Sequence, residues 1–125
     1  MSDFAVFEGH NYLNIKTFRT NGEGVPTPVW FYKEDDTLYI TTGKTSGKVK
    51  RIRQNPQVEV APCEADGVLL GDFEPAQAEL LQSDGEQNHA YTLLKSKYGH
   101  EDVWTNMVER GDPAVRTYIK VMPRA

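Results

Sequence analysis

Residues 12–42 read YLNIKTFRTNGEGVPTPVWFYKEDDTLYITT, and this stretch decides the fold. Side chains alternate between two faces with a period of two over residues 12–18 and again over 25–32, the pattern of half-buried β-strands. Residues 20–24 contain an Asn-Gly pair, which supplies the positive φ angles of a tight turn. A second polar turn leads to a third alternating segment at residues 38–42. The pattern predicts three consecutive antiparallel strands joined by short turns, a β-meander.

The periodicity becomes helical after residue 45. Val49 and Ile52 lie three residues apart among charged side chains, and Asn55-Pro56 ends the pattern. We therefore predict one short basic helix over residues 46–55. Five cations fall within ten residues of this region: Lys44, Lys48, Lys50, Arg51 and Arg53.

The rest of the chain continues the mainly-β pattern. Ser83 and Glu86 form a Ser-x-x-Glu capping box that begins a helix ending at Gly99. A second helical piece follows and ends at residue 111. Three further strands are predicted, over residues 57–61, 72–81 and 114–121. The whole chain, residues 1–125, is then a single mainly-β domain: a small barrel of six antiparallel strands with short α-helices inserted.

Composition narrows the class of protein. With 38% hydrophobic and 26% charged residues, the chain has the balance of a folded domain. The net charge of −4 argues against a general nucleic-acid binder. The longest apolar run, residues 68–70, is far too short to cross a membrane. The N-terminus has no apolar signal segment, and Cys63 is the single cysteine. We expect a cytoplasmic protein with no membrane or nucleic-acid partner.

The glycine-rich turn before the basic helix is a candidate phosphate site. Residues 43–49 read GKTSGKV, which lacks both the spacing and the Ser/Thr after the lysine that a phosphate-binding loop requires. A turn that leads into a helix beside cations nevertheless attracts phosphate, and Thr41, Thr42 and Ser46 could add hydrogen bonds. The alternative is that Ser46 only caps the helix and the cations form a solvated face.

Two prolines mark the second strand. Pro26 and Pro28 lie two residues apart, and each removes a backbone N–H from the β-ladder. They could leave the backbone open at a rim where Thr27 and Val29 face a flat ligand. An ordinary edge strand protected against aggregation explains them equally well.

No motif assigns a catalytic residue. His10, His89 and His100 are too scattered for a metal site, and Cys63 has no neighbouring base, so we expect a structural thiol. No hydrolase, metalloprotease or dinucleotide-binding signature is present. Five aromatic residues at strand or helix spacing are expected in the core or in a subunit interface: Trp30, Phe31, Tyr32, Tyr91 and Trp104.

Five segments taken together closely resemble one protein family: residues 17–19, 25–31, 38–42, 46–56 and 60–63. The family is the flavin and deazaflavin oxidoreductases related to pyridoxamine 5′-phosphate oxidase. More narrowly, the chain resembles the class-B branch, which depends on coenzyme F-420.

The resemblance implies a split β-barrel homodimer with the cofactor at the subunit interface. It implies that five residues form a cradle for the cofactor's phosphate: Thr41, Thr42, Ser46, Gly47 and Lys48. It also implies that three residues line the isoalloxazine or deazaflavin ring: Thr27, Pro28 and Val29.

Gly47 departs from the pattern of the FMN-dependent relatives, which tend to carry an arginine there. This departure favours F-420 over FMN. The resemblance implies an oxidoreductase in which the cofactor delivers hydride to a small conjugated substrate, so no catalytic side chain is required. Two alternatives remain: an FMN-dependent reductase or oxidase, and a non-catalytic flavin- or haem-binding protein.

Overall fold

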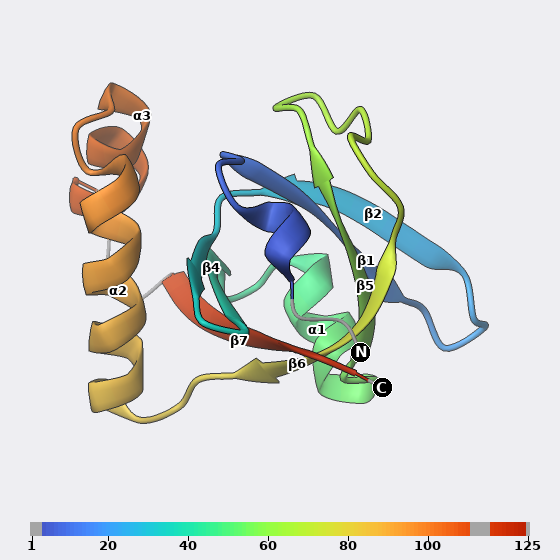
Figure 1. Ribbon diagram of the computed structural model, residues 1–125. Helices are drawn as coiled ribbons and strands as arrows, with labels where there is room; N and C mark the ends of the chain where they lie inside the picture. The colour runs from blue at the N-terminus through green and yellow to red at the C-terminus, as the bar shows by residue number, and fades with distance from the viewer. Residues whose placement is uncertain (1–3, 111–115, 125) are drawn as a thin grey trace.

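The structure is a computed structural model that describes residues 4–110 and 116–124. Its centre is an antiparallel sheet with the strand order β2-β1-β5-β6-β7-β4-β3, which curls into an open barrel (Figure 1). Strands β2 and β4 approach each other without pairing, and a slit remains between them. The strands are β1 (Tyr12–Phe18), β2 (Gly24–Val29), β3 (Tyr32–Glu34), β4 (Thr37–Gly43), β5 (Gln57–Cys63), β6 (Glu74–Leu80) and β7 (Arg116–Pro123).

The mainly-β antiparallel architecture is confirmed, but the predicted number of six strands is wrong: the described residues form seven. The predicted second strand, residues 25–32, is divided at Trp30 and Phe31 into β2 and β3. The backbone N–H of Phe31 donates to the hydroxyl of Tyr98, at 3.0 Å, and so leaves the ladder. The predicted meander is also wrong, because β1–β2 and β3–β4 form separate hairpins at opposite ends of the sheet.

Strand β2 is an edge strand, as we expected if its prolines protect an edge against aggregation. Pro26 lies opposite Lys16 and Pro28 opposite Asn14 on β1. Successive backbone N–H groups of a strand point to opposite edges, so both prolines lack a donor on the same edge. Strand β5 runs on through Pro62 to Cys63, two residues beyond its predicted end. The first two residues of the predicted strand 114–121 lie outside the described residues.

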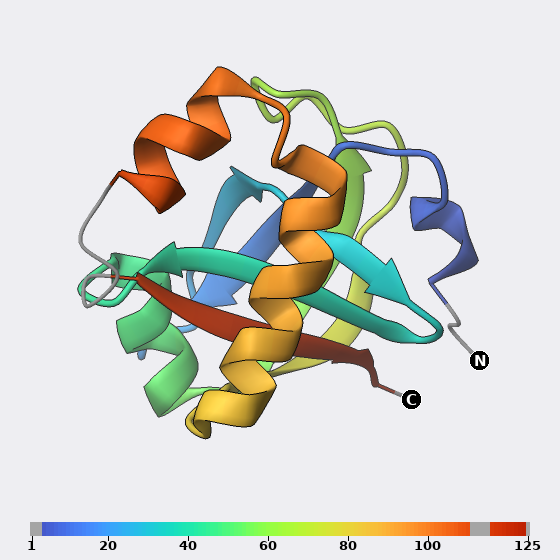
Figure 2. The same cartoon turned by 90° about the vertical axis from the view of Figure 1, so that its left-hand side faces the viewer.

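The predicted helices are confirmed, except that the predicted end of the last one, residue 111, lies outside the described residues. Helix α1 (Gly47–Gln54) begins at Ser46, whose hydroxyl accepts from the N–H of Val49, and it packs against β1 and β6. Helix α2 (Asp84–Tyr98) begins at its capping box and covers the outer face of β4 and β7 (Figure 2). A short helix, α3 (Asp102–Trp104), continues into a π-helical turn, η2 (Thr105–Glu109); a 3₁₀ turn, η1 (Ala5–Phe7), lies near the N-terminus.

Two hydrophobic cores result. The barrel core is mainly aliphatic, with Leu13, Ile40 and Ile119 completely buried. The second core lies between the sheet and α2–α3 and is mainly aromatic: Trp30 stacks on Tyr98, with ring centroids 4.9 Å apart. Two of the five aromatic residues named in the sequence analysis are buried core residues, Phe31 in the first core and Trp104 in the second. The other three are partly buried and pack against the second core: Trp30, Tyr32 and Tyr91.

Several negative findings apply to the residues that the structure describes. None of their helices is both long and apolar enough to cross a membrane. No three of their His, Cys, Asp or Glu side chains come together as a potential metal site. Cys63 is a buried free thiol, and burial, followed by the charges of Asp66 and Glu64, raises its pKa. A raised pKa keeps the thiol protonated and unreactive.

Candidate functional site

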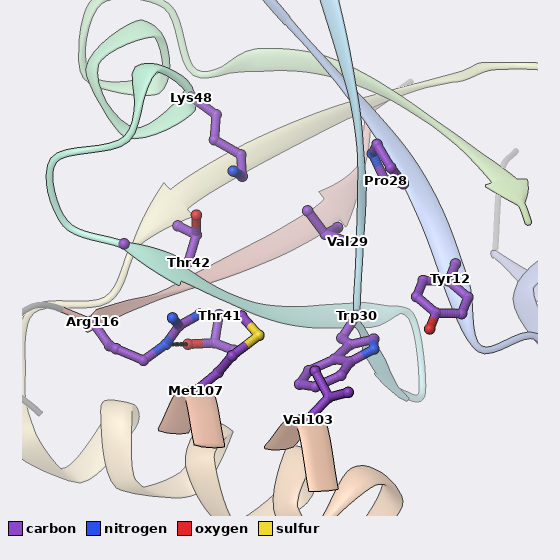
Figure 3. Close-up of a pocket in the computed structure, with 11 residues that line it drawn as sticks. Tyr12, Pro28, Val29, Trp30, Thr41, Thr42, Lys48, Val103, Met107 and Arg116 are labelled. Atoms are coloured by element: carbon purple, nitrogen blue, oxygen red, sulfur yellow. Dashed lines mark hydrogen bonds between the residues drawn. The ribbon is translucent and has the colours of Figure 1, made fainter. Parts of the chain in front are cut away.

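A cavity of about 360 Å³ lies in the slit between β2 and β4 (Figure 3). This volume falls within the usual range of small-molecule sites. Eleven residues line it: Tyr12, Pro28, Val29, Trp30, Thr41, Thr42, Gly43, Lys48, Val103, Met107 and Arg116.

Two strand edges without strand partners border the cavity. Strand β3 pairs with β4 only as far as Tyr39, so residues 41–43 have a neighbour in the sheet only on the β7 side. Across the slit, β2 pairs with β1 alone and carries Pro28 and Val29. The slit thus offers β4 backbone groups on one side and an apolar rim on the other. Such a slot suits a flat ligand with polar edges.

Lys48 supplies positive charge on one side of β4. It lies in the first turn of α1 and points towards Thr42, whose hydroxyl donates to Ser46 Oγ at 3.4 Å (Figure 3). Burial lowers the pKa of Lys48, and the positive charges of Arg51 and Arg116 lower it further. No carboxylate lines the described part of the cavity. An anionic ligand would relieve this repulsion, because an opposite charge favours the protonated amine.

Arg116 supplies a second positive charge on the opposite side of β4 (Figure 3). It pairs with Gly43 in the register of β4 and β7, which places it on the same face as Thr41. Its Nε donates to Thr41 Oγ1 at 3.3 Å, and Thr41 in turn donates to the carbonyl of Thr117 at 3.1 Å.

The third side of the cavity is apolar and comes from the helical layer. Val103 and Met107 lie one helical turn apart and line the cavity beside Trp30 (Figure 3). Their exposed fractions are 52% and 47%, high for apolar side chains that border a cavity. They are therefore available to contact a ligand.

Glu109 ties this apolar wall to α2. Its carboxylate accepts a hydrogen bond from the Tyr91 hydroxyl at 2.6 Å and another from Trp104 Nε1 at 2.9 Å. The Tyr91 hydrogen bond, with a smaller effect from Trp104, lowers the pKa of Glu109. Lys95 adds an ion pair at 3.7 Å. One carboxylate thus holds η2 in place beside the cavity.

The structure brings together five of the eight residues predicted for the site: Pro28, Val29, Thr41, Thr42 and Lys48. Thr27 does not line the cavity; it lies opposite Ile15, farther along β2. Ser46 does not line it either, because its hydroxyl caps α1.

Gly47 also lies outside the cavity, and the space beside it is taken by another side chain. A Cβ at this position would lie 2.7 Å from Nη1 of Arg51. The guanidinium of Arg51 occupies that space, and its Nε donates to Thr17 Oγ1 at 2.6 Å. The absence of a side chain at residue 47 therefore makes room for a different arginine on the same helix.

Six cavity residues were not predicted: Tyr12, Trp30, Gly43, Val103, Met107 and Arg116. Three of these residues had a local signal in the sequence. Trp30 directly follows the predicted Val29, and the spacing of Val103 and Met107 places both on one helical face. Arg116 had no such signal. It reaches the cavity only through the long-range pairing of β7 with β4.

The family model described as Pyridoxamine 5′-phosphate oxidase matches residues 4–124. The chain belongs to this family. The pyridoxamine 5′-phosphate oxidase family includes flavin oxidoreductases, so family membership supports flavin-type chemistry in general. No curated protein matches the chain significantly by sequence.

Solved structures confirm the split-barrel fold of this pyridoxamine 5′-phosphate oxidase family member. An F420 reductase superposes with a TM-score of 0.64 at 21% identity, over 100% of this chain and 95% of that one. An FAD-binding protein from Mesorhizobium loti gives 0.71 at 17% identity, over 96% and 86%. The heme storage protein HutZ from Vibrio cholerae gives 0.68 at 10% identity, over 94% and 84%. At these identities the likeness shows a shared fold.

Proposed function

We propose that this chain is an oxidoreductase that binds the deazaflavin coenzyme F-420 in the slit between β2 and β4 and reduces a small conjugated substrate. One observation carries the proposal: a single cavity joins a positively charged side, with no carboxylate among its described lining residues, to an apolar, aromatic side. A tricyclic cofactor with a phosphate matches both sides: its phosphate suits the positively charged side and its ring system suits the apolar side. In its reduced form the bound cofactor would supply hydride, and the protein would supply binding, orientation and exclusion of water.

The residues present fit such a cofactor. Lys48 would hold the phosphate, since charge-assisted hydrogen bonds to phosphate are among the strongest available. The hydroxyl of Thr42 would join it by turning its proton from Ser46 Oγ, 3.4 Å away, to the phosphate. The unpaired edge of β4 and the side chain of Val29 would hold the ring. No side chain is assigned a proton-donating role.

The surroundings of α1 favour F-420 over FMN. A second hollow, of about 410 Å³, lies beside Gly47 and contains Arg19, Lys50 and Arg51. Arg19 is paired with Glu23 at 2.9 Å, while no ion pair of Lys50 or Arg51 occurs among the described residues. A long anionic tail, which F-420 has and FMN lacks, would find countercharges here. The structural likeness to an F420 reductase agrees with this choice.

FMN is the second candidate cofactor, because the Lys48 side of the cavity would accept any phosphate. A haem carrier is less well supported, although HutZ shares the fold. The described cavity lining contains no histidine or cysteine, and Tyr12 and Met107 are its only side chains of a type that binds haem iron.

Titration of the apoprotein with F-420 and with FMN, side by side, tests the proposal. We expect low-micromolar binding of F-420, weaker binding of FMN, and oxidation of reduced F-420 with a conjugated acceptor. Lys48→Ala should weaken cofactor binding by about 1–3 kcal/mol, roughly 5- to 150-fold, because a charge-assisted hydrogen bond is lost. Lys120→Ala is the matched control, since Lys120 pairs with Glu79 and does not line the cavity.

Each contrary result has a definite meaning. A preference for FMN would replace F-420 by the second candidate. An unchanged affinity in Lys48→Ala would remove this lysine from the cradle. Cofactor that binds tightly but never turns over with any reductant would indicate a carrier rather than an enzyme.

We further propose that the protein is a homodimer with the cofactor site at the subunit interface. Val68, Leu69 and Leu70 are consecutive and have exposed fractions of 59%, 44% and 47%. An exposed apolar group of this kind is typical of an interaction surface. Light scattering should give twice the chain mass, and Leu69→Asp should shift the protein towards monomer. A stable wild-type monomer that binds cofactor tightly would contradict the dimer.

A further inference from the structure

We infer that Arg116 binds a carboxylate of the substrate, and that the substrate is therefore a planar compound carrying a carboxylate beside its unsaturated or aromatic group. The inference rests on the proposed function, because it assigns the part of the cavity that the cofactor's phosphate would leave free.

The guanidinium of Arg116 has few partners among the described residues. Arg116 is half-buried, and burial lowers its pKa, yet no carboxylate forms an ion pair with it among the described residues. The hydrogen bond from its Nε to Thr41 uses one of five N–H donors. Removing a charge from water is costly unless the charge is paired, so the donors that have no partner among the described residues would suit an anionic ligand. The fork of donors fits the two oxygens of a carboxylate.

Arg116 and Lys48 lie on opposite sides of β4 (Figure 3). Thr41 and Thr42 are consecutive on β4, so their side chains lie on opposite faces of the sheet. Arg116 contacts Thr41, whereas Lys48 points towards Thr42, and Figure 3 shows the two cations on opposite sides of the strand. A phosphate held by Lys48 and Thr42 does not occupy the Arg116 side. A second anion therefore has its own place.

An apolar surface borders the cavity on the Arg116 side of β4. Met107, Val103 and Trp30 line the same cavity as Arg116 and are drawn on this side of the strand (Figure 3). These three apolar side chains would suit a planar hydrocarbon or aromatic group, and the flexible thioether of methionine adapts to the shape of such a group. A guanidinium at the end of such a wall selects a compound whose carboxylate is attached to that flat group.

Binding measurements with two probes test the inference without relying on turnover. Cinnamate carries a planar apolar group and a carboxylate, and methyl cinnamate is its neutral counterpart. We would titrate each into the chain by isothermal calorimetry, first without cofactor and then with the cofactor that it binds. The wild type should bind cinnamate at least ~10-fold more tightly than the ester, the factor expected for a charge-assisted pair.

Variants locate the site. Arg116→Gln should reduce cinnamate affinity at least ~10-fold and leave the ester unchanged, while Arg116→Lys, which keeps the charge without the planar fork, should fall between. Arg53→Gln is the matched control, because Arg53 is an exposed arginine of α1 outside the cavity. Thermal melting of each variant checks that it is folded.

Three results would overturn the inference. These are equal binding of acid and ester by the wild type, an unchanged ratio in Arg116→Gln, and a loss in that variant of F-420 or FMN affinity instead of cinnamate affinity. The last would place Arg116 in the cofactor cradle. If the wild type binds neither cofactor but still selects cinnamate through Arg116, the carboxylate site stands and the proposed function fails.

Discussion

The barrel and the helical layer border the same cavity but are held together by different forces. The barrel combines continuous strand ladders with an aliphatic core, so its shape depends on many small contacts. The helical layer depends on a few aromatic stacks and on a small number of hydroxyl and carboxylate hydrogen bonds. The Lys48 side of the cavity is therefore joined to a continuously packed barrel, whereas the Val103–Met107 side is attached to that barrel at a few points.

The largest expected effect comes from the barrel core. Ile119 is completely buried on β7, opposite Ile40 and Leu80. Ile119→Ala should lower the free energy of unfolding by about 2–5 kcal/mol, because it removes buried methyl groups and leaves a cavity. Urea denaturation measures this. Met122→Ala, at an exposed position of the same strand, should cost about 0.5 kcal/mol or less. Similar losses in both variants would contradict a barrel held by its core.

A smaller effect is expected where the two regions join. The Tyr98 hydroxyl accepts from the N–H of Phe31 at 3.0 Å and lies 2.8 Å from the carbonyl oxygens of Phe31 and Asn11. Tyr98→Phe should lower the free energy of unfolding by about 1–3 kcal/mol, because it leaves buried backbone groups unsatisfied. It should also change the fluorescence of Trp30, which stacks on this ring.

The control for that variant is Tyr32→Phe. Tyr32 has no hydroxyl hydrogen bond within the described residues, so its loss should be nearly neutral. If Tyr98→Phe were equally neutral, the helical layer would not depend on this attachment point.

The smallest expected effect is a pH dependence at the same junction. Lys97 Nζ donates to the carbonyls of His10 and Phe31, at 2.8 and 2.9 Å. Burial, partly offset by Glu8, lowers the pKa of Lys97 to about 8. Above this pH the unfolded chain binds the extra proton, so stability should rise as the pH increases from about 8. Burial also raises the pKa of Tyr98 above its ordinary value of 10.0. Above pH 10.0 the folded chain therefore keeps a proton that the unfolded chain loses, and this opposes the rise in stability due to Lys97.

Urea unfolding at pH 8, 9 and 10 measures this contribution. The free energy of unfolding of the wild type should rise relative to that of Lys97→Met, which has no proton to lose at this site. Lys44→Met, at an exposed position, should follow the wild type. Parallel curves for wild type and Lys97→Met would show that the lysine is not desolvated.

Local chemistry explains which features could be predicted from the sequence. Side-chain alternation located the strands, and two serines marked the starts of α1 and α2, because capping acts over three or four residues. Five of the eight predicted residues line one cavity because three adjacent segments, in β2, β4 and α1, converge there. The division of β2 from β3 was missed because it depends on the Tyr98 hydroxyl, 67 residues away.

The sequence by itself determined the mainly-β class, the helix starts and the cation-rich turn with Lys48, since each depends on residues close together in the chain. Only the tertiary structure decided that the ends of the sheet leave a slit, that Arg51 occupies the space next to Gly47, and that Arg116 lines the same cavity as Met107. These features depend on strand order and register. Strand register is set by the pairing of distant segments, and it moves a side chain from one face of the sheet to the other with a shift of one residue.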